Sequence, residues 1–290
     1  MPTETVYGLA GNAYKENIIK KIFKIKKRPK CKPIIIHDHS IESIKKYVKE
    51  FPEKALKLAK HFWPGPLTIL LKKKSIIPDV ITGGLPYIGV RIPNHKKVLK
   101  ILSNLDFPVT MTSANISGSI SPTTAEHVKK NIGNKISYIL NGNKCEIGIE
   151  STIIGISKNK IPKIYRIGSI KAEEIKKIIG SVKIIKEKKK LTDNYSIKTP
   201  FIIGNIRELI KKNRKRKIGI FSFNKKYKNI KNQKMLSKKS NLNEAAKNFF
   251  YNLKELDEVK NDIIIASYVP NIGIGKIIND KIKRLKSRKI

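Results

Sequence analysis

The stretch FWPGPLTILL, residues 62–71, marks the end of one expected helix and the start of one expected strand, and this order indicates the fold class. Apolar spacing before it predicts an amphipathic helix over 53–62, which Trp63-Pro64-Gly65-Pro66 ends because proline cannot continue a helix. The apolar run 67–71 then predicts a buried strand. A helix followed within a few residues by a buried strand is typical of an α/β protein.

Helices and strands alternate irregularly on both sides of this stretch, up to about residue 185. The residues expected to be helical are 13–27, 41–48, 53–62, 97–102, 125–131 and 169–179. The residues expected to be strands are 34–36, 67–71, 87–92, 108–112, 136–140, 151–156 and 162–167. This alternation predicts one α/β domain over 1–185 with a mixed sheet.

A smaller α/β domain is expected over 201–290, after a polar and irregular linker at 186–200. Strands are expected in it at 201–203, 218–223 and 262–267, and helices at 205–212, 241–256 and 276–285. The lysine-rich stretch 224–240 is expected to be a mobile loop.

The chain is strongly basic. Its 63 lysine and arginine residues against 22 aspartate and glutamate residues give a formal net charge of +41. Such an excess favours a polyanionic partner, such as a nucleic acid, a nucleotide or an anionic membrane. Lysine, isoleucine and asparagine are also the residues that an A/T-rich genome would enrich, so the charge by itself leaves both explanations open.

The cysteine count and the lack of targeting or membrane-spanning segments indicate the cellular compartment. Two cysteines, Cys31 and Cys145, cannot build a disulfide framework, which fits a reducing cytoplasm. The first residues carry neither the basic nor the apolar region of a secretory signal. No uncharged apolar run approaches the roughly 20 residues that a membrane span needs. We therefore expect a cytoplasmic protein without membrane association.

Common catalytic motifs do not match. The sequence has no Walker A pattern, no G-x-G-x-x-G and no G-x-S-x-G. Its five histidines and two cysteines lack ligand spacing, so we expect no protein-ligated metal. Gly273-Ile274-Gly275-Lys276 is expected to be a turn and helix cap.

Four polar clusters stand at the edges of the expected elements. Hydroxyls, amides and cations in such places can bind an anion, but they also cap helices and end strands. A helix that ends in Lys-x-Arg is equally a solvated terminus favoured by the helix dipole. The clusters are Pro2–Leu9, Lys26–Pro29 with Pro33 and His37, Thr112–Thr123, and Gly148–Thr152 with Arg166.

Taken together and in this order, the clusters resemble the YrdC-like threonylcarbamoyl-AMP synthases. The matching motifs are PTETVYGL (2–9), KxRP with Pro33 and His37, FWPGPLT (62–68), VRIP (90–93), TSANxSGxxSPT (112–123) and GIEST (148–152). The segments 241–258 and 269–285 resemble the extra domain of the long, two-domain form. The resemblance implies a YrdC-like twisted mixed sheet with helices and a smaller Rossmann-like C-terminal domain.

The chain departs from the family pattern in two places. Family members usually carry about twenty residues, including a first strand, before PTETVYGL. Either the start of this chain is misplaced, or, as we expect, the N-terminal strand is missing. The family linker usually ends in His-Tyr-Ala-Pro, whereas Asn194-Tyr195-Ser196-Ile197 stands in this chain. Tyr195 is kept and the histidine is not.

The resemblance implies an enzyme, a nucleotidyltransferase. Its reaction is L-threonine plus bicarbonate plus ATP to threonylcarbamoyl-AMP plus pyrophosphate. A separate transferase complex would use the product to make threonylcarbamoyladenosine beside the tRNA anticodon, and a weak contact with tRNA is expected. Mg²⁺ would arrive bound to the ATP phosphates. A carbamate attacking a phosphate brings two anions together, so catalysis should consist mostly of positioning and charge neutralisation.

The resemblance also implies roles for individual residues. The expected catalytic residues are Lys26, Arg28, Ser113 and Asn115. The expected ATP-binding residues are Arg28, Lys32, Asn115, Thr123, Arg166 and Tyr195. The expected threonine-binding residues are Thr5, His37, Arg91, Ser113 and Ser151.

Two other functions stay open at this point. A non-catalytic tRNA- or RNA-binding module would suit the charge, although no aromatic-interleaved RNA motif is visible. Carbamoyl-phosphate handling, as in hydrogenase-maturation proteins with a YrdC-like domain, would require cysteine pairs that this sequence lacks.

Overall fold

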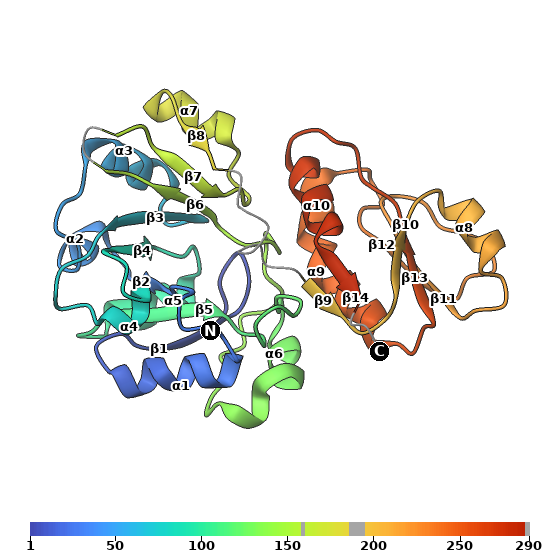
Figure 1. Cartoon of the computed structure of the whole chain (residues 1–290), viewed down its shortest axis with the longest axis horizontal. Helices are drawn as coiled ribbons and strands as arrows, with labels where there is room; N and C mark the ends of the chain where they lie inside the picture. Colours follow the sequence, from blue (N-terminus) through green and yellow to red (C-terminus); the bar gives the residue numbers. More distant parts are fainter. Residues whose placement is uncertain (158–159, 186–194, 288–290) are drawn as a thin grey trace. The chain divides into compact units, whose positions relative to one another are not determined.

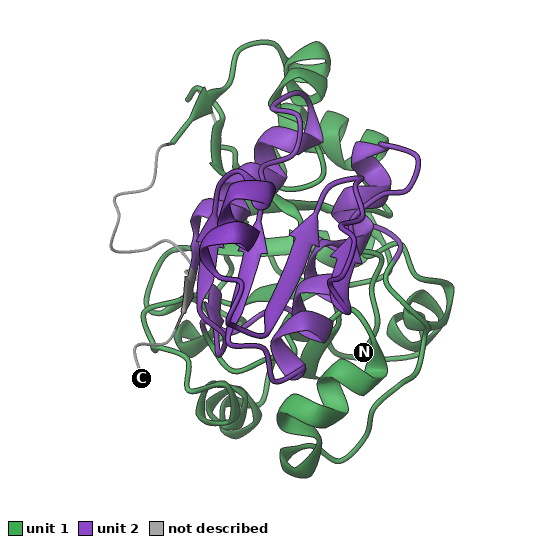
Figure 2. Cartoon of the chain, turned by 90° about the vertical axis from the view of Figure 1, so that its right-hand side faces the viewer, with its two compact units in different colours: residues 1–117, 122–145, 150–190 green, residues 118–121, 146–149, 191–290 purple. Residues whose placement is uncertain are grey.

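The computed structural model describes residues 1–157, 160–185 and 195–287. The chain forms two compact units, coloured separately in Figure 2. The first contains 1–117, 122–145 and 150–185; the second contains 195–287 together with the short segments 118–121 and 146–149. Most of the expected linker, 186–194, lies outside the described residues, and residues 195–197 of it form a strand.

The first unit is built on one mixed sheet of eight strands (Figure 1). Their order is β1-β5-β2-β4-β3-β6-β7-β8. Three neighbouring pairs are parallel (β2 with β4, β3 with β6, β7 with β8) and the other pairs are antiparallel, which confirms the mixed sheet. The strands are β1 Gly8–Asn12, β2 Ile35–His37, β3 Leu67–Lys72, β4 Tyr87–Arg91, β5 Val109–Ser113, β6 Thr152–Gly155, β7 Lys163–Arg166 and β8 Lys183–Ile184.

Side-chain caps explain where several helices of this unit begin. Ser40 accepts a hydrogen bond from the Ser43 amide at the start of α2, and Thr124 accepts one from the His127 amide at the start of α6. The helices are α1 Glu16–Lys26, α2 Ile41–Lys45, α3 Glu53–Phe62, α4 Asp79–Thr82, α5 Lys96–Ser103, α6 Ala125–Ile132 and α7 Ala172–Ile179, with a 3₁₀ turn at Gly133–Lys135.

The turn at 62–66 behaves as its sequence predicts. Helix α3 ends at Phe62, and the indole N–H of buried Trp63 donates to the Leu67 carbonyl at 2.7 Å. The strand expected at 136–140 does not form. Ile136 and Ile139, three residues apart, both pack against the core cluster that includes Tyr7 and Val128, and this spacing does not suit the two-residue period of a strand.

The second unit is built on a four-stranded sheet with the order β10-β13-β11-β12, parallel throughout (Figure 1). Helix–strand alternation around a parallel sheet is what a Rossmann-like unit requires. A separate parallel pair joins β9 and β14. The elements are β9 Tyr195–Ile197, β10 Phe201–Ile203, α8 Ile206–Lys212, β11 Ile218–Ser222, β12 Asn232–Met235, α9 Leu242–Glu258, β13 Ile263–Ala266, α10 Ile274–Lys283 and β14 Leu285–Ser287.

The two central strands of this second sheet, β11 and β13, are buried along their whole length. Ile218 and Ile220 of β11 pack on the face that carries α8, whereas Phe221 meets Phe249 of α9 with ring centroids 5.6 Å apart. The expectation of a mobile loop over 224–240 is wrong. Residues 232–235 pair in parallel with β11, and Leu236 and Ser237 after them are buried.

Among the described residues no helix is long and apolar enough to cross a bilayer.

A single hydroxyl, that of Thr152, fixes how β6 meets the segment 168–170. It donates to the Ile170 carbonyl at 2.8 Å and accepts from the amides of Gly168 and Ile170, at 2.9 and 3.2 Å.

Thr152→Val should lower the free energy of unfolding by on the order of 3 kcal/mol, because two buried N–H groups lose their acceptor. Urea denaturation measures this loss. Thr110→Val is the matched control: its buried hydroxyl makes one 3.3 Å hydrogen bond, and we expect less than about 1 kcal/mol. Equal losses in the two variants would contradict the prediction.

Candidate substrate-binding site

The first polar cluster is a buried turn that precedes β1. The Thr3 hydroxyl accepts from the amides of Thr5 and Val6, both at 3.2 Å, and lies 2.9 Å from the Thr5 hydroxyl. The Tyr7 hydroxyl donates to the Asn143 carbonyl at 2.7 Å. The Tyr7 backbone also joins this turn to both ends of the Thr112–Thr123 cluster, since its N–H donates to the Pro122 carbonyl and its carbonyl accepts from the Ala114 amide.

Arg91, at the end of β4, is the central cation of the site. Its guanidinium lies 2.7 Å from the Glu4 carboxylate, donates to the Thr5 hydroxyl at 2.9 Å and to the Gly65 carbonyl at 3.1 Å. The second Glu4 oxygen accepts from the Asn94 amide at 3.1 Å. Arg91 and Glu4 are 4% and 3% exposed, so water screens their attraction very little.

His37 is the neighbour of Arg91 in the parallel pairing of β2 with β4. It is buried, and its Nδ1 has no hydrogen-bond partner. Burial and the nearby Arg91 charge hold the pKa of His37 well below its usual range. The imidazole is therefore neutral at physiological pH, and it can offer a substrate a hydrogen bond but no charge.

Ser151 and Arg166 form a second group, beside the start of β6. The Ser151 hydroxyl lies 2.9 Å from that of Thr68 and accepts from the Arg166 guanidinium at 3.0 Å. Arg166 also donates to the Ser151 carbonyl at 3.0 Å. The pairing of β3 with β4 and with β6 places Thr68, Ser151 and Arg91 at the same end of the sheet.

Lys26 forms a third group with the turn that follows β5. Its side chain is buried, and its ammonium donates to the carbonyls of Ser113 and Asn115, the latter at 2.6 Å. The Ser117 amide donates to the Lys26 carbonyl at 2.7 Å. The sequence interpretation of Lys26 as a cation pointing at substrate missed this structural task.

Arg28 is held against its own loop. Its Nε donates to the Lys32 carbonyl at 3.0 Å and its Nη2 to the Pro33 carbonyl at 2.8 Å. The guanidinium thereby closes the turn between α1 and β2 and fixes the position of its own charge. Lys32, expected to bind ATP, supplies a carbonyl to that turn.

The two remaining expected nucleotide contacts, Thr123 and Tyr195, also have partners within the protein. Thr123 is buried, with its hydroxyl 3.5 Å from Nδ1 of His127. Tyr195 belongs to the second unit, where its hydroxyl takes a 2.9 Å hydrogen bond from Lys281 and its ring lies 5.1 Å from that of Phe250. Its contacts there are those of a core residue.

Sequence reasoning did not assign roles to two residues that the structure places in the site, Glu4 and Thr68. Both stand inside motifs that were noticed, PTETVYGL and FWPGPLT. The signal for Glu4 is that a lone carboxylate among buried hydroxyls needs a cationic partner, which the VRIP motif supplies.

Together these groups supply hydroxyls, backbone turns, several cations and one carboxylate, which is paired with Arg91. Within the described parts of the chain, no three His, Cys, Asp or Glu side chains come close enough to hold a metal ion. The fold is that of an α/β protein with a mixed sheet, and its clustered hydroxyls and cations are groups of the kind that bind anionic small molecules.

Comparison with known proteins identifies the family. A Sua5/YciO/YrdC family model, described as "Telomere recombination", matches residues 1–168. A second, described as "Threonylcarbamoyl-AMP synthase, C-terminal domain", matches residues 170–285. The chain belongs to the Sua5/YciO/YrdC family, in its two-domain form.

Relatives match along the full length. The threonylcarbamoyl-AMP synthase of Pyrococcus abyssi is 35% identical over 311 residues, covering 100% of this chain and 90% of the relative. That of Bacillus subtilis is 32% identical, covering 98% and 87%. The crystal structure of P. abyssi Sua5 complexed with L-threonine superposes with a TM-score of 0.90 at 35% identity, over 99% of this chain and 91% of that one.

The buried ion pair leads to a stability prediction. Glu4→Gln should destabilise the protein by about 3 kcal/mol or more, because it leaves the buried Arg91 charge without its counter-ion. The free energy of unfolding in urea measures this. Glu53→Gln is the control: it breaks the exposed pair of Glu53 with Lys57 and should leave the urea midpoint unchanged. A Glu4 variant as stable as the control would show that Arg91 is compensated by other groups.

The lowered pKa of His37 predicts a pH dependence. Below about pH 6.5 the unfolded chain binds a proton at this histidine and the folded chain does not, so acidification favours unfolding. Stability contributed by neutral His37 is complete above that pH and falls below it. Between pH 7.5 and pH 5.5 the wild type should lose more stability than His37→Gln, measured by urea midpoints. Exposed His61→Gln should lose as much as the wild type, and an identical pH response in all three would refute the assignment.

Proposed function

We propose that this protein is a threonylcarbamoyl-AMP synthase. L-threonine, bicarbonate and ATP give threonylcarbamoyl-AMP, pyrophosphate and water. The observation that carries the proposal is the hydrogen-bonded set around Thr5, Arg91 and Ser151, in a chain that matches a threonine-bound Sua5 structure along its whole length. We infer that this set forms the threonine-binding side of the site.

Threonine would be held by groups that the fold has already positioned. The Thr5 and Ser151 hydroxyls, each bonded to an arginine, offer contacts to its amine, hydroxyl or carboxylate. Arg91 supplies positive charge for the carboxylate, and Ser113 a further hydroxyl. Neutral His37 offers its buried Nδ1, a polar atom that a bound substrate would satisfy.

The nucleotide side would be formed by the cations and the turn after β5. The threonine amine takes up bicarbonate with loss of water, and an oxygen of the resulting carbamate attacks the α-phosphorus of ATP. The bond to pyrophosphate then breaks. We assign Arg28 and Lys32 to the triphosphate. Asn115, Thr123 and Arg166 are assigned to the rest of the nucleotide. Tyr195 would contact the nucleotide from the linker. Lys26 positions the turn that carries Ser113 and Asn115.

Mg²⁺ would enter bound to ATP. The Glu4 carboxylate is already paired with Arg91, and the other side chains assigned to the site are cations, hydroxyls, an amide and a neutral histidine. These groups suit phosphate oxygens better than a divalent cation, so we infer that the ion is held by phosphates and offsets part of their charge.

The product is an activated anhydride that water destroys readily, so another enzyme must consume it soon after release. We propose that a cytoplasmic transferase passes the threonylcarbamoyl group to adenosine beside the tRNA anticodon.

The proposal is tested by pyrophosphate release with each substrate omitted in turn. Release should require ATP, threonine and bicarbonate together. Release from ATP and threonine in bicarbonate-free buffer, or from ATP by itself, would refute it.

Ser151 distinguishes the two sides of the site. Ser151→Ala should raise the KM for threonine about tenfold or more, because a hydrogen bond to a charged group contributes about 1.5–3 kcal/mol. The KM for ATP should change less than threefold. Exposed Ser103→Ala should alter neither. Steady-state pyrophosphate release gives both KM values for the wild type and the two variants. A change confined to the KM for ATP would assign Ser151 to the nucleotide side instead.

A further inference from the structure

The second unit contains a stretch in which all charged residues are basic. Residues 211–239 hold 13 lysine and arginine residues and no aspartate or glutamate. The 22 acidic residues of the chain, spread evenly, would place about two of them in a stretch of this length. A codon bias toward lysine raises the number of cations everywhere, but it does not by itself remove the acids from one segment.

Twelve of these thirteen cations are exposed. Lys234 lies 3.7 Å from Glu255, and the other twelve basic residues are exposed and form no ion pair within the part of the chain that the structure describes. Ten of them lie between the end of α8 and the start of β12, and we call these ten the basic face. They are Lys211, Lys212, Arg214, Lys215, Arg216, Lys217, Lys225, Lys226, Lys228 and Lys231.

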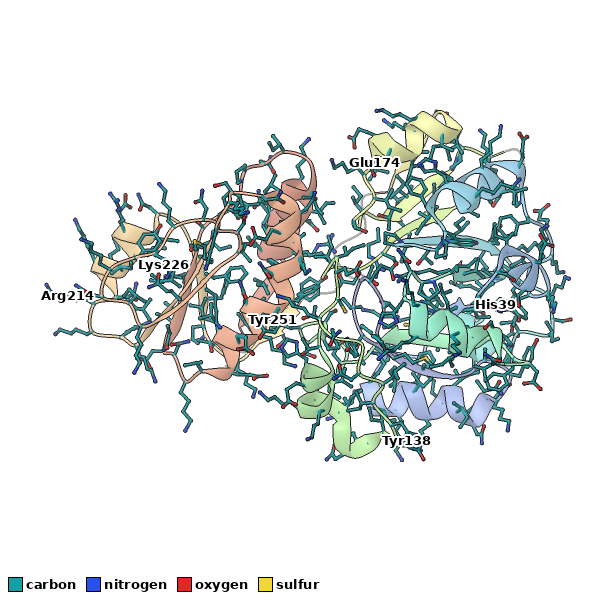
Figure 3. All side chains as sticks on the ribbon, turned by 180° about the vertical axis from the view of Figure 1, so that it is seen from behind. His39, Tyr138, Glu174, Arg214, Lys226 and Tyr251 are labelled. Atoms are coloured by element: carbon teal, nitrogen blue, oxygen red, sulfur yellow. The ribbon has the colours of Figure 1, made fainter. Side chains whose placement is uncertain are left out.

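The backbone that carries the basic face is anchored. Tyr227 and Ile230 pack against the same isoleucine cluster as α8, so their segment and that helix lie on one face of the sheet. The Gln233 side chain bonds both the N–H and the carbonyl of Tyr227, at 2.9 and 3.0 Å, and the Ile230 carbonyl at 2.7 Å. Figure 3 shows Arg214 and Lys226 on the side of this sheet where α8 lies. The cations therefore project from a fixed surface.

The surroundings of the cations indicate which polyanion fits. No large hydrophobic side chain between Ile184 and Val259 is exposed among the described residues. A membrane-binding surface would present apolar residues for insertion. A surface for single-stranded nucleic acid would present exposed aromatic rings for stacking. Cations without either suit the phosphate backbone of double-helical RNA, which proteins contact chiefly at phosphates and 2′-hydroxyls.

We propose that the basic face is a docking surface for the phosphate backbone of a folded RNA. The inference rests on the charge, exposure and anchoring of this face, and it would stand if the proposed synthase activity failed. Binding should be insensitive to sequence and should weaken steeply as salt rises, because each phosphate contact releases counter-ions.

The test compares two quadruple variants of the full chain with equal net charge. One removes four lysines of the basic face, by Lys212→Gln, Lys215→Gln, Lys225→Gln and Lys228→Gln. The control removes four exposed lysines of α3 and α5, by Lys54→Gln, Lys60→Gln, Lys97→Gln and Lys100→Gln. The probe is a fluorescent, unmodified tRNA transcript, followed by anisotropy at several salt concentrations. Vesicles of phosphatidylserine and phosphatidylcholine form a parallel arm.

The basic-face variant should bind the transcript at least tenfold more weakly at low salt. Its slope of log affinity against log salt should be shallower by roughly 3, as expected for four lost phosphate contacts. The control should stay within twofold of wild type. Equal losses in both variants would mean that net charge governs binding, and would overturn the proposal. Absence of RNA binding by the wild type would also overturn the proposal. The same holds if the wild type binds vesicles more tightly than RNA and the basic-face variant loses that vesicle binding. Circular dichroism and pyrophosphate release check that both variants are folded.

Discussion

The ion pair between Glu4 and Arg91 holds together the parts of the first unit that the site needs. From the end of a central strand, its guanidinium contacts the turn before an edge strand and the Gly65 carbonyl that precedes β3. Burying two charges is expensive, and replacement of such a pair by apolar groups often leaves stability unchanged. Its value here is geometric, because Arg91 can satisfy its donors only when these segments meet in one arrangement. The Thr5 hydroxyl is positioned as a result.

Contacts within the protein also position the other side chains of the candidate site. Lys26 binds carbonyls of the turn after β5, Arg28 closes its own loop, and Ser151 is fixed between Thr68 and Arg166. Each of these side chains is thus oriented by contacts within the protein itself. Preoriented dipoles need no reorganisation when charge moves, which is how a site lowers the barrier for one anion attacking another.

Much of the fold could be predicted from the sequence because local signals and tertiary packing agree. The helix over 53–62 is an example, since an amphipathic stretch, a proline stop and a buried strand follow one another. The strand at 232–235 could not be predicted, because Asn-Gln-Lys-Met is polar and becomes a strand only by pairing with β11. For the site, the motifs located the right segments. The tasks of Lys26 and Arg28 stayed hidden, because cations that bind carbonyls and cations that bind phosphates look the same in a sequence.

Two short segments that precede residue 150, 118–121 and 146–149, belong to the second compact unit. The Gly118 carbonyl accepts a 2.6 Å hydrogen bond from the Ser196 amide, and Gly148 lies so close to the Lys247 carbonyl that a side chain would not fit. These pieces flank Asn115, Thr123 and Ser151 in the sequence. During synthesis on the ribosome, the loops that carry these residues emerge long before their partners do. These two short segments therefore stay without their partners in the second unit until most of the chain has been made, and a truncated translation product would lack those partners.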